Sequence, residues 1–478
     1  MSTQRAEPPP PGPSGASSGI RTALRFTGIP ESWITKRPKL PSRNWLIFIG
    51  VTSSVLSLYV YDRKKCRDIR TSYIKRVEHL AHEPMGSMEL PRKVTVYASK
   101  WPGDEDANRS LRFFKKYVKP IIVAAAIDYD VQNGKRHGDL ARQISEKIKT
   151  QRRIDAGLEE PVVSPVVTPI KLSREEETAK HLAGGLIIVG RMTFKEYLEG
   201  LRRGWSESPE RVDREDVLAH ILEDDGHFDE SEPTESSSTL DGEPIPTASR
   251  LMSGQNAKTF SPLQLSPSAS SSSSRPTLLD IPPPEFIPPQ PPLLLVPFTN
   301  HIGFKQIPLM IADFFNQRAK VAAGAEAAYR IIVGHTRPIV APSSSPIPAP
   351  LFSPDGRQPE TDLDFDRLGE SYFQPSLSSI MHEIAKSRDE YYAKLPARLA
   401  TARALARGER EPTKEEQNSP PPTEVDLRAE RMKKEMRWRN DEEGWGIIRP
   451  DKDAAWDERF RNALRVFSDP PREDTISH

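Results

Sequence analysis

The sequence has a single cysteine, no excess charge of one sign and few hydrophobic residues. Cys66 is the one cysteine of the sequence, which excludes a disulfide within the chain and an all-cysteine metal site. There are 68 lysine and arginine residues against 67 acidic residues, interleaved along the chain, so no basic block points to nucleic acid. Only 36% of the 478 residues are hydrophobic, and 47 are proline. With a mean hydropathy of -0.59, this composition predicts that much of the chain does not pack into a core.

Motifs for metal or nucleotide chemistry are also missing. There is no HExxH, no GxGxxG and no GxxxxGK[ST], and the single GxSxG match, at Gly15, lies in a proline-rich segment where no strand-turn-helix can form. His79 and His82 are better explained as a solvated helix face than as metal ligands. Pairs of polar residues elsewhere fit solvent-facing positions at least as well as a catalytic or binding role: Asp128 with Asp130, Glu159 with Glu160, and Asn300 with His301.

One stretch is unlike the rest. No charge interrupts residues 45–61, and about 17 helical residues is the lower limit for crossing a bilayer. Trp45 at one end and Tyr59 and Tyr61 at the other suit the two membrane interfaces. Small residues recur at three- and four-residue spacings, which predicts a face that packs against another helix: Gly50, Ser53, Ser54 and Ser57. We therefore predict a transmembrane helix rather than a buried core helix, because no comparably apolar helix is nearby to cover it.

The composition changes along the chain and predicts its organisation. More than forty residues precede the apolar run, so it is not a cleaved signal peptide, and basic residues on both sides leave its orientation open. The predicted segments are a basic, proline-rich arm over 1–43, a transmembrane helix over 44–62, a helical stalk over 63–90, an α/β domain over 91–222, a disordered Ser/Pro/acidic insertion over 223–292, a second part of the α/β domain over 293–336, a proline-rich loop over 337–375 and a helical C-terminal region over 376–478.

Short apolar runs alternate with amphipathic helices beyond the stalk. The expected strands lie at 93–98, 121–131, 184–190, the start of 293–318, and 328–336. Strands that alternate with helices, and that are apolar enough to be buried on both faces, are typical of βαβ units. The sequence therefore predicts a three-layer α/β domain with a parallel sheet.

Several blocks resemble one known family. "KLPSRNW", "KVTVYASKWPGD", "VKPIIVAAAIDYDVQNGKRHGDLA", "GGLIIVGRMTFKEYLEGLRRGW" and "VPFTNHIGFKQIPLMIADFFNQR" are similar to the fungal 54-kilodalton subunits of the mitochondrial inner-membrane carrier translocase. The resemblance covers 39–205 and 293–335 most clearly. It implies an inner-membrane protein with its N-terminal arm in the matrix and its large domain in the intermembrane space. The implied partners are the pore-forming subunit, small intermembrane-space chaperones and inner-membrane lipid.

A fainter resemblance links the chain to diacylglycerol and sphingosine kinases. In "LIIVGRMTFKE", Gly190 and Thr193 match the glycine and threonine of the loop that holds nucleotide phosphates in those kinases. Arg191 and Met192 stand where Asp and Gly are wanted, and a methionine side chain obstructs the close approach of backbone amides to phosphate. This resemblance implies a lipid-kinase-like scaffold stripped of its catalytic loops.

These observations favour a translocase subunit without enzymatic activity. The expected role is scaffolding the insertion of polytopic carrier proteins, and no cofactor or metal is expected. An active lipid kinase and a membrane tether that acts through the insertion and the C-terminal helices are the alternatives. Cys66, just outside the span, is compatible with an intermolecular disulfide or with an unpaired thiol.

Overall fold

The computed structural model describes residues 42–86, 91–160, 174–229, 282–341, 361–373, 375–413, 416–417 and 420–470. The chain divides into two compact units, Met1–Lys64 and Lys65–His478, and each is treated by itself. The N-terminal arm, most of the expected insertion and the centre of the proline-rich loop lie outside the described residues.

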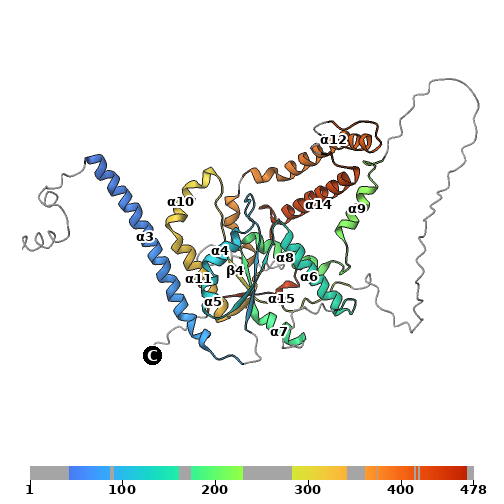
Figure 1. The fold of residues 1–478 in the computed structure, drawn as a ribbon. Helices are drawn as coiled ribbons and strands as arrows, with labels where there is room; N and C mark the ends of the chain where they lie inside the picture. The colour runs from blue at the N-terminus through green and yellow to red at the C-terminus, as the bar shows by residue number, and fades with distance from the viewer. Residues whose placement is uncertain are drawn as a thin grey trace, which may run out of the picture. The chain divides into compact units, whose positions relative to one another are not determined.

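Helix α3 (Arg43–Val77) carries the apolar run (Figure 1). Within the described residues it is the one helix that is long and apolar enough to cross a membrane, with a mean hydropathy of 1.4 over 18 residues and none of that window buried. The helix continues without a break into the expected stalk, because neither proline nor glycine follows Gly50 before it ends. A short 3-10 helix, η1 (Glu78–His82), completes the stalk.

The second unit is built on a six-stranded sheet with the order β2-β1-β3-β4-β6-β5. All neighbouring strands are parallel except β5 and β6, which are antiparallel, so the sheet is mixed rather than wholly parallel. Its strands are β1 (Lys93–Ala98), β2 (Asp128–Asn133), β3 (Leu186–Val189), β4 (Leu293–Val296), β5 (Thr336–Pro338) and β6 (Arg465–Phe467).

Both faces of the sheet are covered by helices (Figure 1). Alternate side chains of β3 divide between the faces: Ile187 and Val189 belong to one core, and Leu186 and Ile188 to the other. The first core includes residues of α4 (Arg109–Tyr117), α5 (Lys119–Ala124) and α11 (Gln317–Val333). The second includes residues of α6 (Asp139–Asp155) and α8 (Arg191–Ser206). This arrangement confirms the expected α/β class.

Two expected strands are wrong. Residues 121–131 begin in α5 and reach a strand only at β2, and residues 328–336 lie mostly in α11. A short apolar run has the same pattern in a buried strand and on the buried face of a helix, so periodicity cannot separate them. For α5, the run of alanines that follows favours a helix by composition, and Pro120 in the first turn favours the start of a helix at this point.

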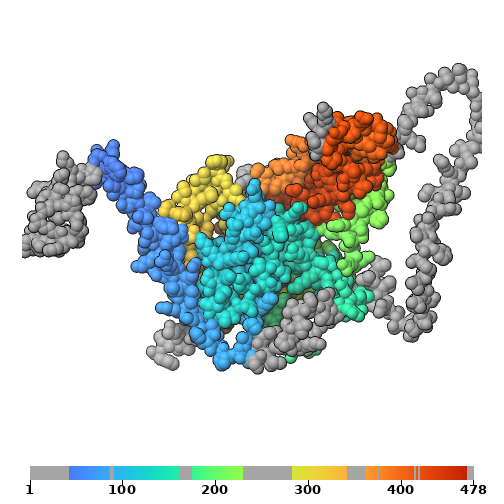
Figure 2. All heavy atoms as spheres, in the orientation of Figure 1, coloured from blue at the N-terminus to red at the C-terminus, as the bar shows by residue number. Residues whose placement is uncertain are grey.

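The C-terminal region is not only helical, because it supplies strand β6 between β4 and β5. Its helices α12 (Ile380–Ala406) and α14 (Glu424–Ile448) pack together next to α9 (Arg214–Glu223), as Figures 1 and 2 both show. Phe228 joins their shared core although it lies inside the expected insertion. Ile287, near the other end of that insertion, packs into the second core of the sheet. The described ends of the insertion are therefore part of the fold.

Candidate functional site

The carboxyl ends of β1, β3 and β4 meet at one edge of the sheet, where open α/β folds bind their ligands. The loop after β1 contains Ser99, the turn after β3 contains Gly190, and the loop after β4 contains Phe298. A fourth segment, residues 361–373, lies against these loops and is called the closing segment below. It is held there by the contacts of Arg191 and Phe298 that follow.

Gly190 makes the turn from β3 into α8. Its φ of +81 and ψ of 160 fall in a region that is nearly restricted to glycine. Its amide donates a hydrogen bond to the carbonyl of Val296 (2.8 Å), and a Cβ at this position would lie 3.2 Å from the Cβ of Phe298. The space above the glycine is thus filled by the loop after β4.

Thr193, the second phosphate-loop candidate, is buried and fully engaged. Its hydroxyl donates to the carbonyl of Val189 (2.6 Å) and accepts from the amide of Ser99 (3.0 Å), with the Ser99 hydroxyl also 3.0 Å away. These bonds tie the start of α8 to the end of β1. The structure therefore gives Thr193 a role in joining the two loops.

Two buried cations share one acid beneath the closing segment. Oε1 of Glu370 accepts from Nε of Arg191 (2.7 Å) and lies 2.5 Å from Nζ of Lys195. The Arg191 and Lys195 side chains are 2% and 1% exposed. Nη1 of Arg191 also donates to the carbonyls of Leu363 and Phe365, at 2.8 and 2.9 Å. Burial lowers the pKa of Lys195, and the contact with Glu370 only partly opposes this.

A second acid of the closing segment faces the loop after β4. Oδ2 of Asp366 accepts from the amide of Phe298 (3.0 Å). Burial raises the pKa of Asp366 to about 6, against the effect of that hydrogen bond. Trp101 packs edge-on against Phe298 and Phe373, with ring centroids 5.6 and 5.2 Å apart. The closing segment is thus fastened by charge, hydrogen bonds and aromatic contact.

Sequence reasoning missed Lys195, Asp366 and Glu370. No motif marks them, and 175 positions separate Lys195 from Glu370. The only signal was Arg191, whose presence in place of the kinase aspartate indicated a changed loop.

Asn300 and His301 line a cavity of about 390 Å³ beside this edge. Nδ2 of Asn300 donates to Oδ2 of Asp104 (2.7 Å), and Nε2 of His301 lies 3.3 Å from Oδ2 of Asp313. Nδ1 of His301 is buried and has no hydrogen-bond partner among the described residues. The cavity is open and mixed in character, and its acids are already paired with neighbouring side chains.

The other candidate residues lie apart from this edge. Asp128 and Asp130 are on β2, an edge strand, with exposed side chains. Nε of Arg153 donates to Glu159 (2.7 Å). Cys66 is 8% exposed and packs against Tyr117 and Val321. On α3 the span residues are exposed: Trp45, Gly50, Ser53, Ser54, Ser57, Tyr59 and Tyr61.

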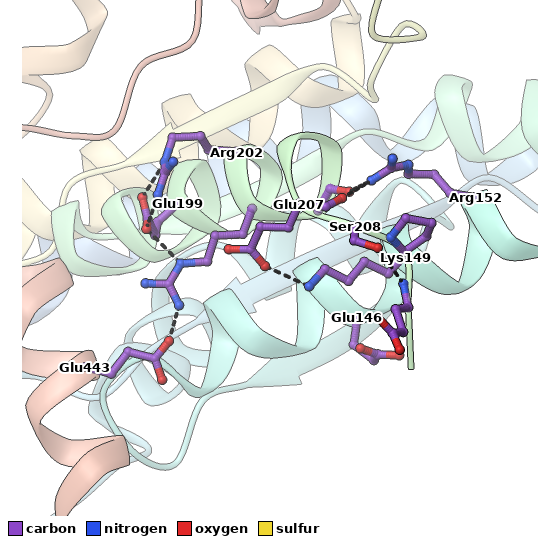
Figure 3. Close-up of polar contacts among 12 residues, drawn as sticks. Glu146, Lys149, Arg152, Glu199, Arg202, Glu207, Ser208 and Glu443 are labelled. Atoms are coloured by element: carbon purple, nitrogen blue, oxygen red, sulfur yellow. Dashed lines mark hydrogen bonds and ion pairs between the residues drawn. The ribbon is translucent and has the colours of Figure 1, made fainter. Parts of the chain in front are cut away.

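A polar network fastens α14 to the α/β core (Figure 3). Glu443 of α14 is paired with arginines from three helices: Arg142 of α6 (3.5 Å), Arg203 of α8 and Arg214 of α9 (2.9 Å). The backbones approach closely at the same place, since a Cβ on Gly444 would lie 2.1 Å from the carbonyl oxygen of His137. The C-terminal helices are therefore positioned by the α/β core.

A family model described as "Inner membrane protein import complex subunit Tim54" matches residues 21–345. The chain is 39% identical over 458 residues to "Mitochondrial import inner membrane translocase subunit TIM54" of Cryptococcus neoformans var. neoformans serotype D, covering 95% of each chain. It is 32% identical to the tim54 subunit of Aspergillus oryzae over 314 residues, which are 63% of this chain and 67% of the relative. The family match includes α3 and strands β1 to β5.

Proposed function

Because the chain belongs to the Tim54 family of subunits of the mitochondrial inner-membrane import complex, we propose that it acts as a non-enzymatic scaffold for the insertion of polytopic carrier proteins. Helix α3 anchors it in the inner membrane, with the N-terminal arm in the matrix and the large domain in the intermembrane space. The domain's surface docks the small chaperones that deliver substrate, and its span contacts the pore-forming subunit.

One observation carries the non-enzymatic part of this proposal. The sheet edge at which α/β proteins bind ligands is occupied by the chain's own closing segment, and the Thr193 hydroxyl is taken by backbone groups. Met192 is 3% exposed, so its side chain packs inward at the position where a phosphate loop needs a glycine. We therefore assign the function to the outer surface of the domain and to the span.

The small-residue face of the span is proposed as the contact with the pore-forming subunit. The hydroxyl of Ser54 donates a hydrogen bond to the carbonyl of Gly50 within the same helix (2.8 Å). The small side chains on this face therefore allow another helix to approach closely. At about 100° per residue, Gly50, Ser53, Ser54 and Ser57 lie within one side of the helix. Trp45 and the tyrosines set its depth.

The test is affinity purification of the tagged full chain from mitochondria in mild detergent, followed by mass spectrometry. Co-purification of the pore-forming subunit and the small chaperones is expected. Ser54→Leu should lower recovery of the pore-forming subunit severalfold because it fills the small-residue face. Val55→Leu, one position around the helix, is the matched control and should not. Recovery of a lipid-synthesis or contact-site complex instead would refute the scaffold.

Two further arms separate the alternatives. Replacing residues 231–280 by a Gly/Ser linker of about 20 residues spares Phe228 and Ile287, whose burial the fold needs. A scaffold should keep its partners after this change, whereas a tether acting through the segment should lose them. Adding ATP to the purified chain should leave the thermal midpoint unchanged, and a clear rise would favour the kinase alternative.

A further inference from the structure

Helix α10 (Ile307–Phe315) is an apolar element of the second unit that lies exposed. None of its residues is buried, and Phe304, just before it, is 92% exposed. Figure 2 shows α10 (yellow) projecting from the edge of the second unit. Four exposed apolar side chains share one face at i, i+3, i+4 and i+7 spacing, Ile307, Met310, Ile311 and Phe314, and a fifth, Leu309, lies on the opposite side. Asp313 is the one charged residue among the nine. A helix that is apolar on all sides belongs in a protein core or in lipid.

The single charge on α10 is neutralised. Oδ2 of Asp313 lies 2.6 Å from Nζ of Lys320 and 3.3 Å from Nε2 of His301. The start of the helix is also fixed, because Nε2 of Gln306 donates to the carbonyl of Tyr372 in the closing segment (2.6 Å). The apolar surface is therefore held in place by the domain.

Chain length places this helix near a bilayer. Cys66, five residues after the apolar run ends at Tyr61, already packs against Val321 of α11. Five helical residues span about 8 Å, and the six from Phe315 to Val321 about 9 Å. With the width of the Cys66–Val321 contact added, chain connectivity keeps the C-terminal end of α10 within about 25 Å of the end of the apolar run.

The charge around that point suits an anionic surface. Residues 63–70 read "RKKCRDIR", with five basic side chains and one acid. Lys115 and Lys116 lie in the last turn of α4. Nζ of Lys116 donates a hydrogen bond to Oε1 of Gln317 at the start of α11 (2.8 Å). Clusters of lysine and arginine next to a membrane span attract anionic lipid headgroups.

We infer that α10 inserts its apolar side chains into the leaflet of the bilayer that faces the second unit, and so seats this unit on an anionic lipid surface. At nine residues, about 13 Å, the helix is too short to span and enters one leaflet only. A helix that docks in a protein groove has one apolar face and one polar face, and α10 lacks the polar face. The inference rests on the span of α3 and not on the scaffold function.

The test uses the full chain, with Cys66 replaced by alanine, reconstituted alone in vesicles of phosphatidylcholine and cardiolipin. Ile311→Cys carries an environment-sensitive fluorophore, which nitroxide groups on the lipid chains or iodide in water can quench. Leu56→Cys, in the span, is the positive control. Leu368→Cys, 83% exposed on the closing segment, is the matched control for an exposed apolar position.

Lipid nitroxides should quench the Ile311 label at least about twofold more than the Leu368 label, because interfacial helices bury their apolar face about 5–10 Å deep. Quenching by iodide alone, with the Leu56 label still quenched by lipid, overturns the proposal. Protection from both quenchers also overturns it, since another part of the chain then covers the helix. If the Leu56 label is open to iodide, the span is wrong and the proposal falls with it.

Protection from iodide that appears only in the assembled complex would assign α10 to a protein partner and overturn the lipid assignment. Phe304→Cys provides a second label outside the helix, so the result does not depend on a single substitution. It should follow Ile311 if the whole apolar segment enters the leaflet.

Discussion

Glu370→Ala tests whether the closing segment is held over the sheet by charge. The substitution leaves Arg191 and Lys195 buried without their shared acid. Breaking a buried ion pair from one side costs about 3–5 kcal/mol in the free energy of unfolding. Lys195, whose pKa burial already lowers, can release its proton and limit the cost. We therefore expect a loss near the lower end, about 3 kcal/mol.

The assay is thermal unfolding of the detergent-solubilised full chain, with hydrogen exchange measured across residues 361–373. A loss of about 3 kcal/mol lowers the midpoint by about 6 °C in a domain of this size. Exchange should rise first in the closing segment, because Arg191 also donates to two of its carbonyls. Glu370→Gln, which keeps an acceptor, should lie between the wild type and Glu370→Ala.

Glu390→Ala is the matched control. Glu390 is 59% exposed and lies 4.0 Å from Lys386, so its loss should change stability by less than about 0.5 kcal/mol. A midpoint for Glu370→Ala within about 1 °C of the control would refute the reasoning. It would mean that the closing segment is held by its packing and backbone hydrogen bonds alone.

Two further predictions concern the contact of α14 and α8 with α6. Gly444→Ala should lower the thermal midpoint by several degrees because its Cβ meets the backbone of His137, whereas Gly446→Ala, with nothing within 4 Å, should be neutral or slightly stabilising. Equal midpoints would contradict the close approach. Burial raises the pKa of Glu196 to about 7, above its ordinary value of 4.5. The folded state then binds the proton more tightly than the unfolded state. The free energy of unfolding therefore falls as the pH rises from about 4.5 to 7, by up to about 3 kcal/mol. Glu196→Gln should flatten the stability profile over that range, and an unchanged slope would contradict this assignment.

Several features could be predicted from residues close together in the sequence. The apolar run of α3 is set by the absence of charge over 45–61, and β1 matches its predicted bounds because alternating valines mark a buried strand. β3 and β4 also lie within their expected runs. Where a run had the same pattern in a helix and in a strand, as at α5 and α11, local sequence did not suffice.

The carboxyl edge of the sheet was decided by tertiary structure. Gly190 indicates a turn with positive φ, which glycine adopts readily. No residue close to Gly190 in the sequence indicates that Phe298 fills the space above this turn. The partners of Arg191 lie more than 170 positions away in the chain, and strand β6 comes from a region whose composition is mainly helical.

The sequence by itself determined the membrane anchor, the α/β class and the family. These properties depend on hydrophobic pattern and on local blocks of residues, which act over one helix or strand. Only the tertiary structure decided that the sheet edge is closed by residues 361–373 and that the apolar helix α10 is not buried by the part of the chain that the structure describes. Burial and charge pairing depend on which distant segments meet, and no local pattern records that.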